Sequence, residues 1–265
     1  MRVLHDADGY GEAFADVYDD WYDGSFDTDG AVATLAELAG PGPVLELGVG
    51  TGRLALPLAD RGLPVVGVDA SASMLDRLAT KQGATRVAVV RADMADVADA
   101  VRAAAVGEGG KGGEVPPAGY RLAFCAYNTF LNLHTEAAQR RCLEGVASLL
   151  ADDGALVVEA FVPAAPQDVP RTSLDVARVT TDAVVLTATE HDAALQLVTG
   201  QHVELRDGSV RLRPWRVRYL TPAQLDAVAA AAGLELRERW TDWRRTPFDD
   251  DSDVHVSVYR PRPGR

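Results

Sequence analysis

Short apolar runs alternate with stretches of helical periodicity as far as residue 161. Runs of strand length lie at 44–47, 65–68, 87–90, 120–125 and 155–161, and patterns of helical spacing separate them. Alternation of this kind predicts an α/β fold with a doubly wound, Rossmann-like parallel sheet.

The pattern changes after residue 163. Between 172 and 219, apolar and polar side chains alternate with the period of β-strands in four runs, and turn-forming pairs such as Asp207-Gly208 separate the runs. We expect these runs to form an antiparallel sheet inserted into the parallel one. Thr221-Pro222 then begins a helix, and runs at 234–240 and 254–259 predict a closing antiparallel pair of strands.

Composition narrows the classes of partner. The chain has 265 residues, 26 Lys plus Arg against 39 Asp plus Glu, a net charge of −13 and a pI near 4.8. Proteins that bind nucleic acid usually carry a basic surface, so we expect no nucleic-acid substrate, and a cationic or neutral small molecule fits better. No apolar run has the length of a membrane span and no signal peptide is recognisable, so we expect no membrane partner and a cytoplasmic location. The scattered histidines and two separated cysteines predict no metal site.

A glycine-rich turn joins the first apolar run to the helix that follows. Gly48, Gly50 and Gly52 occupy alternate positions after Glu46. A dinucleotide fingerprint needs the pattern G-x-G-x-x-G. Arg53 occupies the position of its third glycine, which disfavours a nicotinamide oxidoreductase. A plain tight turn is the other alternative for such a loop.

The pattern E-x-G-x-G-x-G, which begins at Glu46, resembles motif I of the class I S-adenosylmethionine (SAM)-dependent methyltransferases. Asp69 ends the second apolar run and is followed by Ser71 and Met74, and Asp93-Met94 follows the third run. These positions also match the family's order, and the resemblance covers nearly the whole chain. The inserted strands are loosely similar to those of amino-sugar N-methyltransferases.

The resemblance implies SAM as the cofactor and a set of residues that bind it. Asp69 would accept hydrogen bonds from the ribose hydroxyls, and Asp93 with Met94 would meet the adenine. An N-terminal segment rich in aromatic residues would close over the cofactor. The full predicted cofactor set comprises Tyr18, Tyr22, Glu46, Gly48, Gly50, Gly52, Asp69, Ala70, Met74, Asp93, Met94 and Cys125. For Asp69 the alternative is a cap of the next helix, and for the aromatic segment it is packing on the core.

Asn132 and His134 are the candidate catalytic residues. Both follow the fourth apolar run, whose carboxyl end should face the ligand crevice. His134 is the only nearby side chain whose ordinary pKa suits a base at neutral pH, although it would also suit the start of the next helix. Arg211, Arg213, Arg216 and Arg218 alternate along the last inserted run, which indicates a solvated face or, alternatively, a site for an anionic group.

The predicted domains are a helical lid over 1–40, a SAM-binding core over 41–162 and 220–265, and a β insertion over 163–219 that roofs the substrate. The resemblance implies methyl transfer to a small-molecule amine or hydroxyl. The rival hypothesis is a SAM-binding protein of the same fold that transfers no methyl group. The inserted sheet is also a candidate for pairing with that of another copy in a homodimer.

Overall fold

The computed structural model describes residues 7–22, 24, 26–107, 114–164 and 171–262. Residues 1–6 of the predicted lid and residues 165–170 of the predicted insertion therefore lie outside the described part. Within that part, no helix has the length and apolar character needed to cross a membrane.

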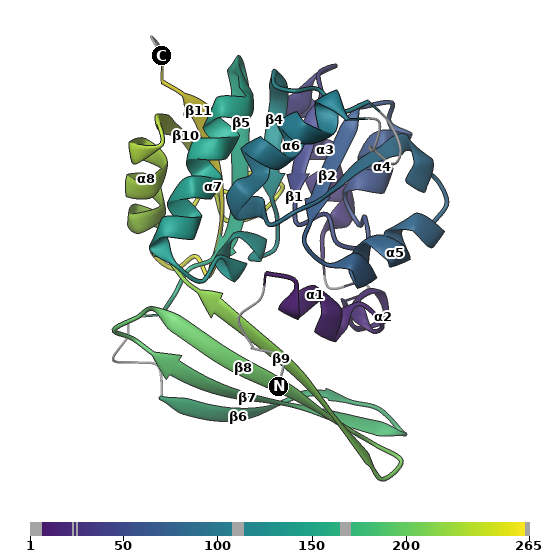
Figure 1. Cartoon of the computed structure of the whole chain (residues 1–265). Helices are drawn as coiled ribbons and strands as arrows, with labels where there is room; N and C mark the ends of the chain where they lie inside the picture. The colour runs from purple at the N-terminus through teal and green to yellow at the C-terminus, as the bar shows by residue number, and fades with distance from the viewer. Residues whose placement is uncertain (1–6, 23, 25, 108–113, 165–170, 263–265) are drawn as a thin grey trace.

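A seven-stranded sheet forms the centre of the larger unit (Figure 1), with the order β10-β11-β5-β4-β1-β2-β3. Its strands are β1 (Val44–Leu47), β2 (Val65–Asp69), β3 (Val87–Arg91), β4 (Tyr120–Cys125), β5 (Leu150–Phe161), β10 (Leu234–Trp240) and β11 (Val254–Pro261). Strands β1 to β5 pair in parallel, whereas β11 runs antiparallel to both β5 and β10. The predicted doubly wound sheet and its closing antiparallel pair are confirmed.

Helices cover both faces of this sheet and bury a separate core on each. Side chains of α3 (Thr28–Ala39), α4 (Ala55–Asp60) and α5 (Ala72–Thr80) pack on one face. Those of α6 (Val97–Val106), α7 (Glu136–Leu149) and α8 (Pro222–Ala231) pack on the other. Three short 3₁₀ turns complete the unit, namely η1 (Ala84–Arg86), η2 (Met94–Asp96) and η3 (Thr129–Asn132). Because apolar strands are covered on both faces, β1 is buried at every position.

The predicted insertion is a separate antiparallel sheet of order β6-β7-β8-β9. Its strands are β6 (Thr172–Val179), β7 (Ala183–Asp192), β8 (Leu197–Arg206) and β9 (Ser209–Arg218). One face packs toward the N-terminal helices, while the other carries most of the exposed large apolar side chains of the described chain.

The N-terminal segment contains two short helices rather than one continuous helix. Helices α1 (Gly9–Phe14) and α2 (Tyr18–Tyr22) lie between the larger unit and the inserted sheet (Figure 1). Phe14 is fully buried in a small cluster with Met74, while Trp21 and Trp215 pack against that cluster. The break at residues 15–17 lets aromatic side chains turn toward both units.

Candidate functional site

A pocket opens at the carboxyl ends of β1, β2 and β3, beneath α1. Because the carboxyl ends of parallel strands meet at one edge, this is where an open α/β sheet binds ligands. The lining comprises Ala7, Tyr10, Gly11, Tyr18, Gly48, Gly50, Val68, Asp69, Ala70, Met74, Ala92, Asp93, Met94, Thr129, Asn132 and Leu133.

The glycine turn forms one wall of the pocket and needs glycine for its shape. Gly48 and Gly50 have φ of +70° and +53°, a region that disfavours any side chain. A Cβ at Gly48 would also come within 2.2 Å of Thr129 Cγ2. Gly52 does not line the pocket; a Cβ there would contact Leu56 and Leu78 at 3.1 Å, so this glycine lets α4 and α5 approach the turn.

Asp69 holds the glycine turn and the start of α5 in place. Its Oδ2 accepts a hydrogen bond from Gly50 N at 2.8 Å and its Oδ1 accepts one from Ser71 N at 2.8 Å. Burial raises the pKa of Asp69, and the two backbone hydrogen bonds oppose that rise. Each carboxylate oxygen can accept a further hydrogen bond, which leaves capacity for a diol in the pocket.

Asp93 and Met94 lie across the pocket from the glycine turn. Asp93 Oδ1 caps η2 by accepting from Ala95 N at 2.8 Å, and Oδ2 has no protein partner among the described residues. Ala70 and Met74 supply apolar surface between Asp69 and Met94. Apolar side chains together with an acidic acceptor suit a purine that carries an amino group.

Glu46 lies in β1 behind the glycine turn and does not line the pocket. It is 5% exposed, and its Oε2 has no hydrogen-bond partner among the described residues. Burial raises the pKa of Glu46 to about 8, Arg53 opposes this rise and Asp69 adds to it. A buried oxygen without a partner is costly, so Oε2 of Glu46 would be stabilised by a hydrogen-bond donor from outside the described residues.

Hydrogen bonds to Glu12 connect helix α1 to the start of α5 above the pocket. Glu12 accepts hydrogen bonds from Ser71 Oγ at 2.9 Å, Ser73 N at 3.0 Å and Ser73 Oγ at 2.6 Å. A Cβ added at Gly11 would come within 2.4 Å of Ser71 Cβ, so glycine permits this close approach. Sequence reasoning missed Glu12 and Gly11, because their partners lie about 60 residues away in the chain.

The predicted aromatic contacts divide between the pocket and its neighbourhood. Tyr18 lines the pocket, as does Tyr10, which sequence reasoning did not select although it shares the helical spacing. Tyr22 does not line it, but Tyr10 Oη donates to Tyr22 Oη at 3.4 Å. The Tyr22 ring lies 5.8 Å from the rings of Phe26 and Tyr127. These aromatic side chains therefore form a cluster that extends from the pocket toward β4.

The loop after β4 has a strained backbone. Tyr127 and Asn128 both adopt positive φ, 49° and 62°. Glu159 stabilises this conformation by accepting from Tyr127 N at 2.7 Å through Oε2 and from Trp243 Nε1 at 2.9 Å through Oε1. Phe161 N donates to Asn128 Oδ1 at 2.7 Å. Strain held by several partners is a feature of functional sites, and this loop leads directly into the pocket residues Thr129 and Asn132.

The two candidate catalytic residues have different surroundings. Asn132 lines the pocket. His134 does not; its Nε2 lies 3.0 Å from the carbonyl oxygen of Arg216 in β9 and must donate to it. Cys125 is 1% exposed within β4, packs in the core, and does not line the pocket either; burial holds the pKa of its thiol well above the usual value.

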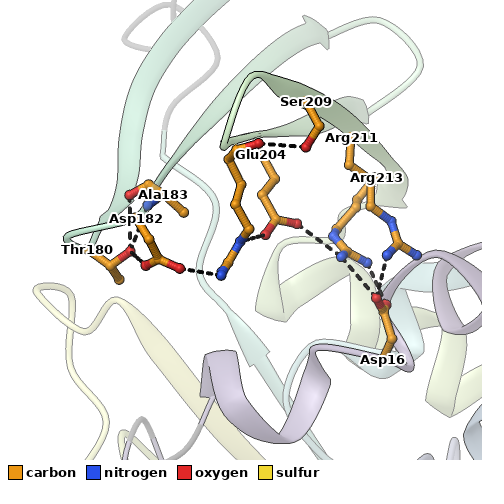
Figure 2. Close-up of polar contacts among 9 residues, drawn as sticks. Asp16, Thr180, Asp182, Ala183, Glu204, Ser209, Arg211 and Arg213 are labelled. Atoms are coloured by element: carbon orange, nitrogen blue, oxygen red, sulfur yellow. Dashed lines mark hydrogen bonds and ion pairs between the residues drawn. The ribbon is translucent and has the colours of Figure 1, made fainter.

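The arginines of β9 do not form a solvated face. Arg213 is 1% exposed and donates from Nη1 to Asp16 Oδ1 at 2.6 Å and from Nη2 to Glu204 Oε2 at 3.1 Å. Arg211 also donates to Asp16, at 2.6 Å. Figure 2 shows both guanidinium groups converging on Asp16, which follows α1. This ion-pair network joins the N-terminal helices to the inserted sheet, so Arg211 and Arg213 already have partners within the protein.

No group of three or more potential metal ligands occurs among the described residues.

Comparison with known proteins identifies relatives of the chain. Residues 44–107 match a family described as "Methyltransferase domain". The CcbJ methyltransferase from Streptomyces caelestis is 38% identical, with a TM-score of 0.83 over 97% of this chain and 99% of that one. No curated protein matches the chain.

Two solved structures of lower identity share the fold. The sugar N-methyltransferase KedS8 from Streptoalloteichus sp. is 19% identical, with a TM-score of 0.62 over 93% of each chain. CalS10, an amino pentose methyltransferase from Micromonospora echinaspora solved with SAM bound, is 18% identical, with a TM-score of 0.59 over 90% of this chain and 91% of that one.

Proposed function

The chain belongs to the SAM-dependent methyltransferases, and from this premise we propose that it methylates a small-molecule amine. SAM supplies, when bound, a methyl group on a sulfonium that is already a good leaving group. The observation that carries the choice of an amine is the lack of a suitable base: among the described lining residues there is no histidine, lysine or cysteine.

The residues of the pocket fit the cofactor. Asp69 would accept from the ribose hydroxyls, and Asp93 Oδ2 would accept from the adenine amino group beside Met94. Glu46 lies behind the glycine turn and does not line the pocket, so its unpaired buried oxygen would reach the cationic amino end of SAM through a water molecule. The protein's contribution is to fix the cofactor in one orientation, and positioning of this kind can lower a barrier by roughly 7–11 kcal/mol.

Neutral phenols lie in and beside the pocket: Tyr10 and Tyr18 line it, and Tyr127 lies next to Tyr22. Burial raises the pKa of Tyr10 and Tyr18, and it raises that of Tyr127 to about 12. These rings therefore stay uncharged at pH 7, and their electron-rich faces attract cations such as a sulfonium or an alkylammonium. A cationic acceptor also suits a protein with a net charge of −13.

The carboxylates of the pocket are poor candidates for a base. Asp69 is held by two backbone N–H groups, and Asp93 is held by one. His134 does not line the pocket, and its Nε2 donates to a backbone carbonyl of β9, so we assign it to the positioning of β9 rather than to proton removal. A hydroxyl acceptor would need its proton removed during the reaction, whereas an amine can lose its proton to water before it reacts.

The roof over the pocket favours a small acceptor. Helix α1 covers the pocket and is joined to α5 by Glu12 and to the inserted sheet by Asp16. A folded protein or a duplex would have to displace this helix to reach the pocket. KedS8 is named as a sugar N-methyltransferase and CalS10 as an amino pentose methyltransferase, which makes amino sugars reasonable first substrates to test.

The proposal is tested by comparing matched acceptors that differ only in an amine or a hydroxyl. We expect methylation of the amine, with a rate that rises with pH along the pKa of each amine used. His134→Gln keeps a donor toward Arg216 and should leave this pH profile unchanged. Transfer to the hydroxyl alone, or a pH profile that disappears in His134→Gln, would refute the amine proposal and restore His134 as a base.

A further inference from the structure

Helix α2 carries Tyr18 and Tyr22 to the site, yet none of its five residues is buried. A helix of this length is not stable by itself in water, so its position depends on the contacts that its side chains make with neighbouring elements. Tyr18 lines the cofactor pocket, and its ring lies 5.0 Å from the ring of Tyr22. The position of α2 therefore sets the placement of both phenols.

Asp19 joins α2 to the larger unit. Its Oδ1 accepts a hydrogen bond from Thr51 Oγ1 at 2.6 Å and another from Lys81 Nζ at 2.9 Å. The other hydrogen bonds between α2 and separate elements lead to α1 and to β6. Within the part of the chain that the structure describes, Asp19 alone bonds α2 to the unit that holds the cofactor pocket.

Thr51 belongs to the glycine turn that forms one wall of the pocket. It follows Gly50, whose N–H donates to Asp69 at 2.8 Å, and it is buried without lining the pocket. A ligand that contacts Gly50 is thus separated from Asp19 by one residue of chain and one hydrogen bond. Lys81 is the C-cap of α5, and α5 begins beside Asp69. Both partners of Asp19 therefore lie on elements that Asp69 also contacts.

The hydrogen bond from Thr51 matters more than the ion pair. Lys81 and Asp19 are 31% and 38% exposed, and ion pairs at such a surface contribute little to stability. Thr51 is buried, and a hydrogen bond from a hydroxyl to a carboxylate is stronger than one between neutral groups. Desolvation would raise the pKa of Asp19, but the hydrogen bonds from Thr51 and Lys81 lower it below its ordinary value, so the carboxylate is charged at pH 7.

An acidic residue at this place has a second explanation, which is its charge near the start of the helix. Asp19 and Asp20 both lie in the first turn of α2, where carboxylates are favourable. Asp20 is exposed, and its carboxylate has no hydrogen bond or ion pair with any described residue. The two positions share the charge but not the contact with the glycine turn, which makes Asp20 the matched control.

We propose that Asp19 is a positioning residue, which holds α2 against the glycine turn and so couples cofactor binding to the binding of the methyl acceptor. The coupling is reciprocal: a cofactor on the turn favours the docked position of α2, and so does an acceptor that contacts Tyr18 or Tyr22. Without the carboxylate, each ligand must first restore the docked position, which weakens its apparent affinity. The acceptor half rests on the proposed function, whereas the cofactor half does not.

Hydrogen–deuterium exchange tests the cofactor half with S-adenosylhomocysteine, the demethylated product of SAM, and needs no acceptor. In the wild type, saturating S-adenosylhomocysteine should slow exchange of the α2 amides by about tenfold, the size of one hydrogen bond to a charged group. Asp19→Ala and Thr51→Val should abolish this slowing. Thr51→Ser, which keeps the hydroxyl, and Asp20→Ala should retain it. The proposal is overturned if the wild type shows no slowing, or if the slowing survives in both Asp19→Ala and Thr51→Val.

Steady-state kinetics test the acceptor half, with the amine that the comparison of matched acceptors identifies. Asp19→Ala should raise KM for the amine about tenfold and change kcat at saturating amine and SAM by less than about twofold. Asp19→Asn keeps an oxygen for Thr51 and should recover most of the loss. A fall in kcat at unchanged KM would overturn the coupling to the acceptor. If no amine is methylated while the exchange results hold, the proposed function fails and the coupling of α2 to the cofactor stands.

Discussion

At the scale of single residues, three acids define the site: Asp69, Asp93 and Glu46. Two of them line the pocket while bonded to backbone N–H groups, and the third is buried behind the glycine turn without a partner for one oxygen. The resemblance to the methyltransferase family predicted all three positions, after the apolar runs had located the strands. Glu12 and Glu159 were not predicted, since a carboxylate in a helix or strand has no local signal for a partner far along the chain.

Asp69→Ala should weaken SAM binding by about 1–3 kcal/mol, because it removes an acceptor from a buried site and frees the amides of Gly50 and Ser71. Isothermal titration calorimetry measures the change. Asp60→Ala, on the exposed surface at the end of α4, is the control and should bind as the wild type does. Equal affinities for the two variants would remove Asp69 from the cofactor site.

Glu46 should make the stability of the cofactor-free protein depend on pH. Its pKa in the folded state is about 8, against an ordinary 4.5, so the folded protein holds more protons than the unfolded chain between these values. Stability attributable to Glu46 is therefore lost as pH rises through this window, by at most about 1.4 kcal/mol per pH unit.

Glu46→Gln isolates this contribution, since the amide is neutral at every pH. Urea unfolding at pH 5, 6.5 and 8 should show the variant gaining free energy of unfolding relative to the wild type at each step. A difference between the two proteins that stays constant with pH would mean that Glu46 keeps an ordinary pKa in the folded state.

At the scale of elements, the N-terminal helices matter because they connect three parts of the fold. Helix α1 contacts the start of α5 through Gly11 and Glu12, and Asp16 continues the connection to β9. Tyr10, Phe14, Tyr18 and Trp21 recur at helical spacing in the sequence, and helices occur there. This spacing could not predict the break at residues 15–17, because the break depends on packing between two units and not on any local helix-breaking residue.

Gly11→Ala should loosen α1 from α5, because its Cβ would lie 2.4 Å from Ser71 Cβ. Overpacking of this kind costs about 1–3 kcal/mol, and we expect a loss of SAM affinity of up to that size, measured by calorimetry. Gly9→Ala is the matched control in the same helix, where a Cβ meets nothing within 4 Å. If both variants bind SAM alike, α1 does not close the cofactor pocket.

At the scale of the whole molecule, the chain combines an acidic α/β unit with an almost neutral β insertion. The sequence predicted both sheets, because apolar runs and strict alternation are strong local signals. It left open which side of the inserted sheet faces the rest of the chain. That choice depends on Arg213, which looked like one of four surface arginines and is instead buried between Asp16 and Glu204. Helix α1 lines the pocket, and Asp16 joins the end of this helix to the insertion; this arrangement supports the small-molecule acceptor that we propose.

The most direct test of the account follows the methyl group itself. Protein is incubated with SAM that carries a deuterated methyl group, together with a metabolite extract, total RNA and intact proteins as separate acceptor pools. Mass spectrometry then locates the label. The account predicts label on nitrogen atoms of small metabolites. Label in RNA or protein with none in metabolites, or bound SAM with no transfer to any pool, would contradict it.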